Sequence, residues 1–221
     1  METFQIHEQF ELYVLNELNS ARLLPGLIFG GGTMLRLCHG LDRYSVDLDF
    51  YLAKPEFRLG LIDKCSQALG RSLRLTDQQE KRNTILIELS SGHYPRKLKI
   101  EINKVRQINT WKPEIAWSPY SNVQVLVNTV TLAEMAAMKT DALLNRREIR
   151  DAYDLEFLLM KKIPILADKD RLREILEQIE GFKPPDFAVK LGSILEPQKR
   201  RYYIENRFSV LRSYLIDRLA G

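Results

Sequence analysis

The hydrophobic pattern changes character near residue 128 of the chain. Before that point, apolar residues recur at helical spacing over residues 5–24 and then alternate with polar residues in short runs, which predicts a helix followed by strands. After residue 129 the helical period dominates, in "TLAEMAAMKTDALLN" and "IRDAYDLEFLLMKK". We therefore predict an α+β unit over residues 1–128 and a helical C-terminal region over residues 129–221.

Shorter elements follow from the same pattern within the first unit. "LIFGG" predicts a buried strand, residues 33–38 a short helix that Gly40 ends, and residues 56–70 a surface helix. Clean alternation predicts strands at "SVDLDFYL", "TILIELS" and "PRKLKIEINKV".

Composition narrows the class of protein. Of 221 residues, 45% are hydrophobic and 28% are charged, which is usual for a globular domain. No apolar run approaches the roughly eighteen residues of a membrane span, and the acidic N-terminal stretch lacks the basic start of a secretion signal. The cysteines and histidines are few and scattered, without the spacing of a zinc site. We expect a cytoplasmic protein with no membrane association and no structural metal.

The net charge of +4 is concentrated at the C-terminal end. Residues 190–221 hold seven Lys or Arg against three Asp or Glu, and "PQKRRYYIENRF" places basic residues beside Tyr202 and Tyr203. Cations beside aromatic rings suit a polyanion whose bases can stack. A solvated helix face with its tyrosines in the core explains the same pattern, and both interpretations stay open.

Two aspartates stand on the polar side of the "SVDLDFYL" strand. Asp47 and Asp49 point to the same side, two strand steps of about 3.3 Å apart. Carboxylates at this spacing can share magnesium ions that also bind phosphate oxygens. The alternative is an edge strand whose acids are simply solvated. Glu101 lies on the polar side of another strand, where it is either a third metal ligand or a solvated acid between lysines.

A glycine turn and a cation precede these acids. "GGGT" opens a predicted helix, so the backbone N–H groups of Gly31 and Gly32 and the hydroxyl of Thr33 can cradle a triphosphate. Arg43 and Ser45 suit the phosphate tail of the same nucleotide. Metal held by carboxylates beside phosphate supports in-line displacement at phosphorus. Neither the Walker phosphate loop nor the dinucleotide-binding glycine motif occurs in the sequence.

The order of these motifs resembles a known family. "GGTMLRL", "RYSVDLDF", "KLKIEI" and "KTDALLNRREIRDAYDL" are similar to the successive motifs of the AbiEii/AbiGii toxin family of nucleotidyltransferases, relatives of the MenT toxins, over residues 29–159. The resemblance implies a polymerase-beta-like nucleotidyltransferase fold, in which a small mixed sheet with helices is followed by a helical region. The family's usual Gly-Ser is Gly-Thr here and its third acid is Glu, both mild departures.

The resemblance also assigns roles to individual residues. It implies metal ligation by Asp47 and Asp49, with Glu101 as the third acid, and a catalytic part for Lys139 and Asp151. It places Gly32, Thr33, Ser45, Arg146 and Arg150 near the nucleotide, and the glycine turn and the cation before the acids add Gly31 and Arg43 to this set. Lys139 and Asp151 are twelve residues apart, which is about 120° around a continuous helix. For both to face one site, the helix should break near residues 145–147; a salt-bridged surface helix is the alternative.

We therefore expect a magnesium-dependent enzyme that transfers a nucleoside monophosphate from an NTP and releases pyrophosphate. The resemblance implies an RNA acceptor, foremost a tRNA 3′ end, and a cognate antitoxin protein as partner. Two other functions fit the same residues: transfer to a protein or small molecule, and regulatory NTP binding without turnover.

Overall fold

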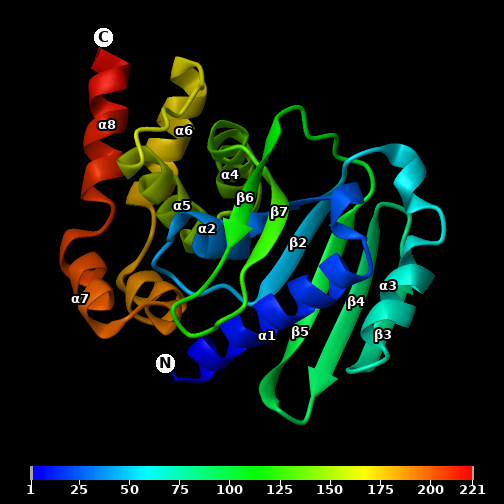
Figure 1. Cartoon of the computed structure of the whole chain (residues 1–221). Coiled ribbons are helices and arrows are strands. Elements are labelled where there is room, and N and C mark those ends of the chain that lie inside the picture. Colours follow the sequence, from blue (N-terminus) through cyan, green and yellow to red (C-terminus); the bar gives the residue numbers. More distant parts are fainter. Residues whose placement is uncertain (1, 221) are drawn as a thin grey trace. The chain divides into compact units, whose positions relative to one another are not determined.

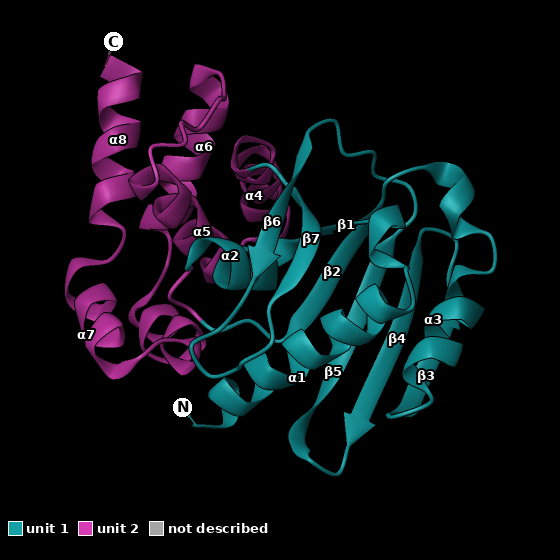
Figure 2. Ribbon diagram, viewed as in Figure 1, with its two compact units in different colours: residues 1–40, 44–131 teal, residues 41–43, 132–221 magenta. Residues whose placement is uncertain are grey.

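The protein, described by a computed structural model over residues 2–220, divides into two compact units (Figure 1). Unit 1 comprises residues 1–40 and 44–131, and unit 2 comprises residues 41–43 and 132–221 (Figure 2). The chain therefore enters unit 2 briefly after Gly40, returns to unit 1 at Tyr44, and passes into unit 2 again after Thr131. The sequence gives no sign of the first, three-residue excursion.

Unit 1 is built on a mixed sheet that has seven strands within residues 2–220, in the order β3-β4-β5-β2-β1-β7-β6. Central strand β2 runs parallel to β5 and antiparallel to β1, and β1 runs parallel to β7. The elements of this unit are α1 (Glu2–Ser20), β1 (Leu27–Gly30), α2 (Gly31–His39), β2 (Asp47–Leu52), α3 (Leu61–Leu69), β3 (Arg74–Glu80), β4 (Thr84–Ser91), β5 (Tyr94–Asn103), β6 (Trp111–Ala116) and β7 (Val125–Val130), with short 3₁₀ turns at Leu24–Gly26 and Pro55–Arg58.

Most of these elements lie where the hydrophobic pattern predicts them. The helix expected over residues 56–70 is interrupted, however, because Gly60 takes a positive φ of 62° between the turn Pro55–Arg58 and α3. Strands β3, β6 and β7 were not predicted. β3 is polar and largely exposed, and β6 contains Pro113, so neither shows the clear alternation of a half-buried strand.

The alternation of β2 and β5 separates an apolar face from a polar one. Leu48 and Phe50 of β2 lie opposite Ile100 and Ile102 of β5, and all four side chains are buried. Helix α1 lies along this apolar face, where Phe10 stacks on Tyr94 with ring centroids 4.4 Å apart. The polar side chains of the two strands consequently project from the opposite face.

Unit 2 is helical, as the pattern after residue 129 predicts. Its elements are α4 (Leu132–Arg146), α5 (Ile149–Met160), α6 (Lys169–Glu180), a π-helical turn (Asp186–Leu191), a 3₁₀ turn (Gly192–Ile194), α7 (Pro197–Asn206) and α8 (Ser209–Ala220). α4 ends at Arg146 and α5 begins at Ile149, with Arg147 in the left-handed region at φ 56°. The predicted break near residues 145–147 is therefore present. Arg43 forms an isolated β-bridge with Leu195, which ties the segment Leu41–Arg43 into this unit.

Candidate active site

Three carboxylates and one ammonium share the polar face of β2 and β5 in unit 1. The parallel pairing sets Asp47 opposite Lys99 and Asp49 opposite Glu101. Lys99 Nζ lies 3.5 Å from Asp47 Oδ2 and 3.6 Å from Glu101 Oε2. The side chains of Asp47 and Glu101 are 35% and 41% exposed, so solvent and a ligand can reach them. We call Asp47, Asp49 and Glu101 the acid face.

The chemistry of the acid face fits a divalent metal. Carboxylate oxygens are the ligands that magnesium takes in phosphoryl-transfer enzymes. Within residues 2–220, no three His, Cys, Asp or Glu side chains are gathered closely enough to form a closed metal cluster as they stand. The ammonium of Lys99 lies between two of the acids instead and serves as their cation.

Gly31 makes room for one of these acids at the start of α2. A Cβ on Gly31 would lie 2.1 Å from Asp49 Oδ2, far inside van der Waals contact. Gly31 also has φ 75°, a left-handed conformation that favours glycine. The first turn of α2 therefore meets the carboxylate of Asp49 at a point where only a glycine fits. The sequence predicted a phosphate-binding role for this turn but not this contact.

Thr33 and His7 hold the backbone where β2 begins. The Thr33 hydroxyl donates to the carbonyl oxygen of Asp47 at 2.6 Å, and His7 Nε2 lies 3.0 Å from that of Val46, which fixes its ring as the donor. The sequence predicts that the Thr33 hydroxyl contacts triphosphate; in this structure Thr33 is fully buried and its hydroxyl makes this backbone contact. The buried Thr33 hydroxyl therefore stabilises the backbone of the acid-bearing strand at Asp47.

Buried charged groups of α1 and α2 lie beneath this strand. Arg36 pairs with Glu8, whose second oxygen accepts from the Ser118 hydroxyl at 2.7 Å. Both oxygens of Glu11 are buried with no hydrogen-bond partner among the described residues, and burial raises the pKa of Glu11 well above its usual value. Burial also lowers the pKa of His7. Sequence reasoning missed this cluster, although acids within the helical apolar stripe of residues 5–24 were a signal for it.

Lys139 and Asp151 come together in unit 2, because the chain turns between α4 and α5. Lys139 Nζ lies 3.1 Å from Asp151 Oδ1 and 2.6 Å from Asp154 Oδ2. Arg146 donates to both oxygens of Asp151, at 2.7 and 2.8 Å, while half of its side chain remains exposed. Asp151 is fully buried, so its position suits orienting Lys139 and Arg146.

Arg43 joins the same network through Asp154. Its guanidinium is buried and donates to both oxygens of Asp154, at 2.6 and 2.7 Å. Burial alone would raise the pKa of Asp154, but Arg43 and Lys139 outweigh it and hold that pKa below its usual value. The sequence suggested that Arg43 binds phosphate, whereas here it neutralises a buried carboxylate. Arg150 is exposed on α5, and Ser45 lies half-buried before β2.

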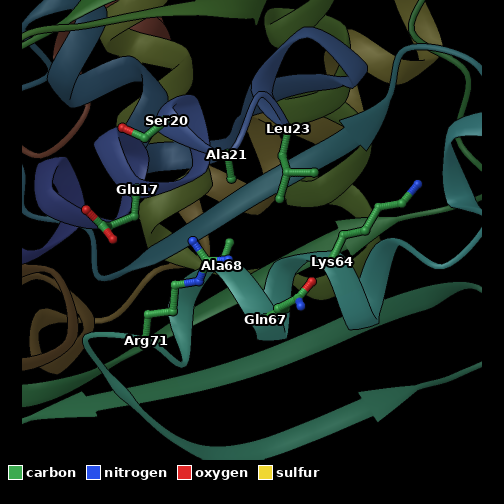
Figure 3. Close-up of a pocket in the computed structure, with 8 residues that line it drawn as sticks. All are labelled: Glu17, Ser20, Ala21, Leu23, Lys64, Gln67, Ala68 and Arg71. Carbon is green, nitrogen blue, oxygen red and sulfur yellow. The ribbon is translucent and has the colours of Figure 1, made fainter.

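A cavity of about 340 Å3 lies elsewhere in unit 1, between α1 and α3 (Figure 3). Its lining includes Glu17, Lys64, Gln67 and Arg71, and none of the residues predicted from the sequence to act in the site. The acid face is a separate feature of the same unit, and it brings together acids from two of the sequence motifs.

Comparison with known proteins identifies the family of this chain. Residues 13–207 match the family described as nucleotidyl transferase AbiEii toxin, type IV toxin–antitoxin system. The chain belongs to the AbiEii family. It is a nucleotidyltransferase toxin of a toxin–antitoxin system, and the resemblance found in the sequence motifs is confirmed. A search of curated proteins finds none that matches the chain.

Solved structures similar to the AbiEii-family chain agree in fold. JHP933 from Helicobacter pylori superposes with a TM-score of 0.58 at 17% identity, covering 97% of this chain and 94% of its own. The nucleotidyltransferase toxin MenT4 from Mycobacterium tuberculosis H37Rv gives 0.51 at 19% identity, covering 95% of this chain and 85% of its own. The nucleotidyltransferase fold predicted from the sequence is thereby confirmed. In residues 2–220, no helix is both long and apolar enough to cross a bilayer.

Proposed function

We propose that this AbiEii-family enzyme uses magnesium to transfer a nucleoside monophosphate from an NTP to RNA, with a tRNA 3′ end as the acceptor. The observation that carries the proposal is the acid face: two strands pair in parallel and bring Asp47, Asp49 and Glu101 to one partly exposed surface. A purely NTP-binding module has no need of three acids at a phosphate site.

The chemistry assigned to the acid face is an in-line displacement. The acceptor hydroxyl oxygen forms a bond to the α-phosphorus, the bond from that phosphorus to the bridging oxygen breaks, and pyrophosphate leaves. A divalent metal, when bound to Asp47, Asp49 and Glu101, supplies positive charge to the phosphate oxygens. A carboxylate oxygen of the same face takes the proton of the acceptor hydroxyl. Gly31, Thr33 and His7 keep the acids in place through the contacts described above.

Three residues of unit 2 remain a proposal as nucleotide contacts and a fourth as their positioning residue, on the strength of their match to the family motif. Lys139, Arg146 and Arg150 supply positive charge for phosphate, and Asp151 positions the first two. Gly31 and Gly32 offer backbone N–H groups at the start of α2, and Ser45 a hydroxyl just before β2.

Helix α7 is proposed to hold the RNA backbone. Tyr203 is buried beside Tyr153, but Tyr202 is 42% exposed, so only one of the two tyrosines belongs to the core. Arg200 and Arg201 are exposed on the same helix. An exposed ring beside two cations suits stacking on a base and contact with phosphate. A cognate antitoxin protein is the expected partner, and the cytoplasm the expected location.

The direct test offers the purified enzyme each of four α-labelled NTPs with magnesium and total tRNA. Label on tRNA, with one nucleotide preferred, supports the proposal. Label on protein or on a small molecule instead would contradict the RNA acceptor while keeping the reaction. Tight NTP binding without pyrophosphate release, across all of these acceptors, would favour a regulatory module.

A further inference from the structure

Lys99 occupies the middle of the acid face. It stands on β5 opposite Asp47 and two residues before Glu101, and its ammonium lies 3.5 to 3.6 Å from a carboxylate oxygen of each. About a third of the side chain is exposed. The ammonium therefore lies within ion-pair distance of two of the three acids.

The negative charges of Asp47, Asp49 and Glu101 explain why a cation such as Lys99 is stable on the acid face. Three carboxylates on one face repel one another, and Lys99 offsets one of the three negative charges. A divalent metal that binds Asp47 and Glu101 must enter the space next to the ammonium, where two positive charges a few ångströms apart repel. The metal and the ammonium therefore compete for the same carboxylate oxygens.

A second lysine of β5, Lys97, pairs with an acid that is not part of the acid face. It points to the same side of β5, two residues earlier, and also pairs with an acid: its Nζ lies 2.6 Å from Glu88 Oε1 of β4. Lys97 is 58% exposed. Its partner Glu88 is not one of the three acids of the acid face, so Lys97 is a control matched for charge and strand.

We propose that Lys99 is the resident cation of the acid face in the metal-free enzyme and that divalent metal binds by displacing it. Lys99 thereby sets the metal concentration that the enzyme requires and keeps the acids from repelling one another before metal arrives. This inference rests on the proposed function, because it takes the acid face as the metal site. Asp47, Asp49 and Glu101 hold the metal. The strength with which Lys99 pairs with Asp47 and Glu101 determines how readily the metal displaces it.

The test measures metal binding without turnover. Mn²⁺ alone is titrated into wild type, Lys99→Met, Lys99→Arg, Lys97→Met and Asp47→Asn, and free Mn²⁺ is followed by electron paramagnetic resonance. Lys99→Met is expected to bind Mn²⁺ about tenfold more tightly than wild type, which corresponds to about 1.4 kcal/mol. Lys99→Arg and Lys97→Met should match wild type. The melting temperature of Lys99→Met without metal should fall, and its rise on adding Mn²⁺ should exceed that of wild type.

The outcomes separate this inference from the proposed function. Equal or weaker Mn²⁺ binding by Lys99→Met, with binding lost in Asp47→Asn, overturns the role of Lys99 and leaves the metal site standing. A higher KM for NTP in Lys99→Met at unchanged Mn²⁺ affinity also overturns it, since Lys99 would then contact phosphate. If neither wild type nor Lys99→Met binds Mn²⁺, the metal role of the acid face fails, and this inference fails with it.

Discussion

Gly31 and Asp49 lie in contact, one at the first turn of α2 and the other on β2. A methyl group on Gly31 would stand 2.1 Å from Asp49 Oδ2 and 2.9 Å from Asp49 Cβ. The glycine turn and the acid-bearing strand, which are separate motifs in the sequence, are therefore one packed feature of unit 1.

Gly31→Ala is expected to disable nucleotidyl transfer with only a modest loss of stability. The new methyl must push Asp49 out of line, and a displacement of about 1 Å at a reacting centre costs about a hundredfold in rate. Gly40→Ala is the matched control: Gly40 ends the same helix with φ 76°, but an added Cβ there meets nothing within 4 Å. Both glycines have a positive φ, so equal activities of the two variants would show that the contact with Asp49 is unimportant.

Asp154→Asn is expected to destabilise unit 2 by about 3–5 kcal/mol, because it leaves the buried Arg43 without its counter-charge. Thermal unfolding measures the change. Asp170→Asn, at an exposed acid of α6, should leave the melting temperature unchanged.

The pH dependence of Asp154→Asn has a definite sign. Since the folded state lowers the pKa of Asp154, its contribution is complete above its usual value of 3.8 and is lost as the pH falls through the folded value. The gap between wild type and Asp154→Asn should therefore narrow below about pH 4. A gap that stays constant down to pH 2 would contradict the account of this network.

Glu11→Gln is expected to stabilise unit 1 at neutral and alkaline pH. Burial raises the pKa of Glu11, so its contribution to stability is complete below its usual value of 4.5 and is lost as the pH rises towards the folded pKa. The melting temperature of Glu11→Gln should exceed that of wild type at pH 8, by about 2–4 °C for each kcal/mol, and the excess should disappear near pH 4.5. His7 Nε2 lies 3.6 Å from Glu11 Oε1, so the difference between the two proteins reports Glu11 together with its pairing to His7. A variant less stable than wild type at pH 8 would show that ionised Glu11 is stabilised in the fold.

Alternation along "SVDLDFYL" was enough to predict which side of β2 carries the acids, because the period of a strand fixes which side chains share a face. The helix break between Lys139 and Asp151 was also predictable once both residues were required at one place. The edge strands were not: β6 tolerates Pro113 because an edge strand has backbone groups without a ladder partner.

Several roles depend on contacts that no local pattern contains. Arg43 is four residues from Asp47 in sequence, yet it belongs to unit 2 and pairs with Asp154, 111 residues away. Thr33 faces a backbone carbonyl that is brought near only by the pairing of β1 with β2. The sequence does not distinguish Lys99 from other strand lysines, because only the parallel register with β2 places it opposite Asp47.

Reversing the charge of Arg200 and Arg201 together is expected to weaken tRNA binding. The double change to Glu removes two phosphate contacts and should reduce the slope of log K against log salt by about two. Tyr202→Ala should weaken binding by about 1–3 kcal/mol through lost stacking, with little change in the salt slope. Filter binding across a salt series measures both effects, and Arg173→Glu on α6 is the control. Unchanged affinity in both α7 variants would remove α7 from the RNA-binding surface.

The central claim is that the acid face of β2 and β5 carries out nucleotidyl transfer. Its most direct test is the rate of pyrophosphate release from the preferred NTP, with magnesium and RNA, in wild type, Asp47→Asn and Asp77→Asn, the last replacing an aspartate of β3. We predict that Asp47→Asn loses activity by at least about a thousandfold, or about 4 kcal/mol of transition-state stabilisation, while its melting temperature stays near that of wild type. Asp77→Asn should retain full activity. Turnover by folded Asp47→Asn at the rate of wild type would contradict the claim.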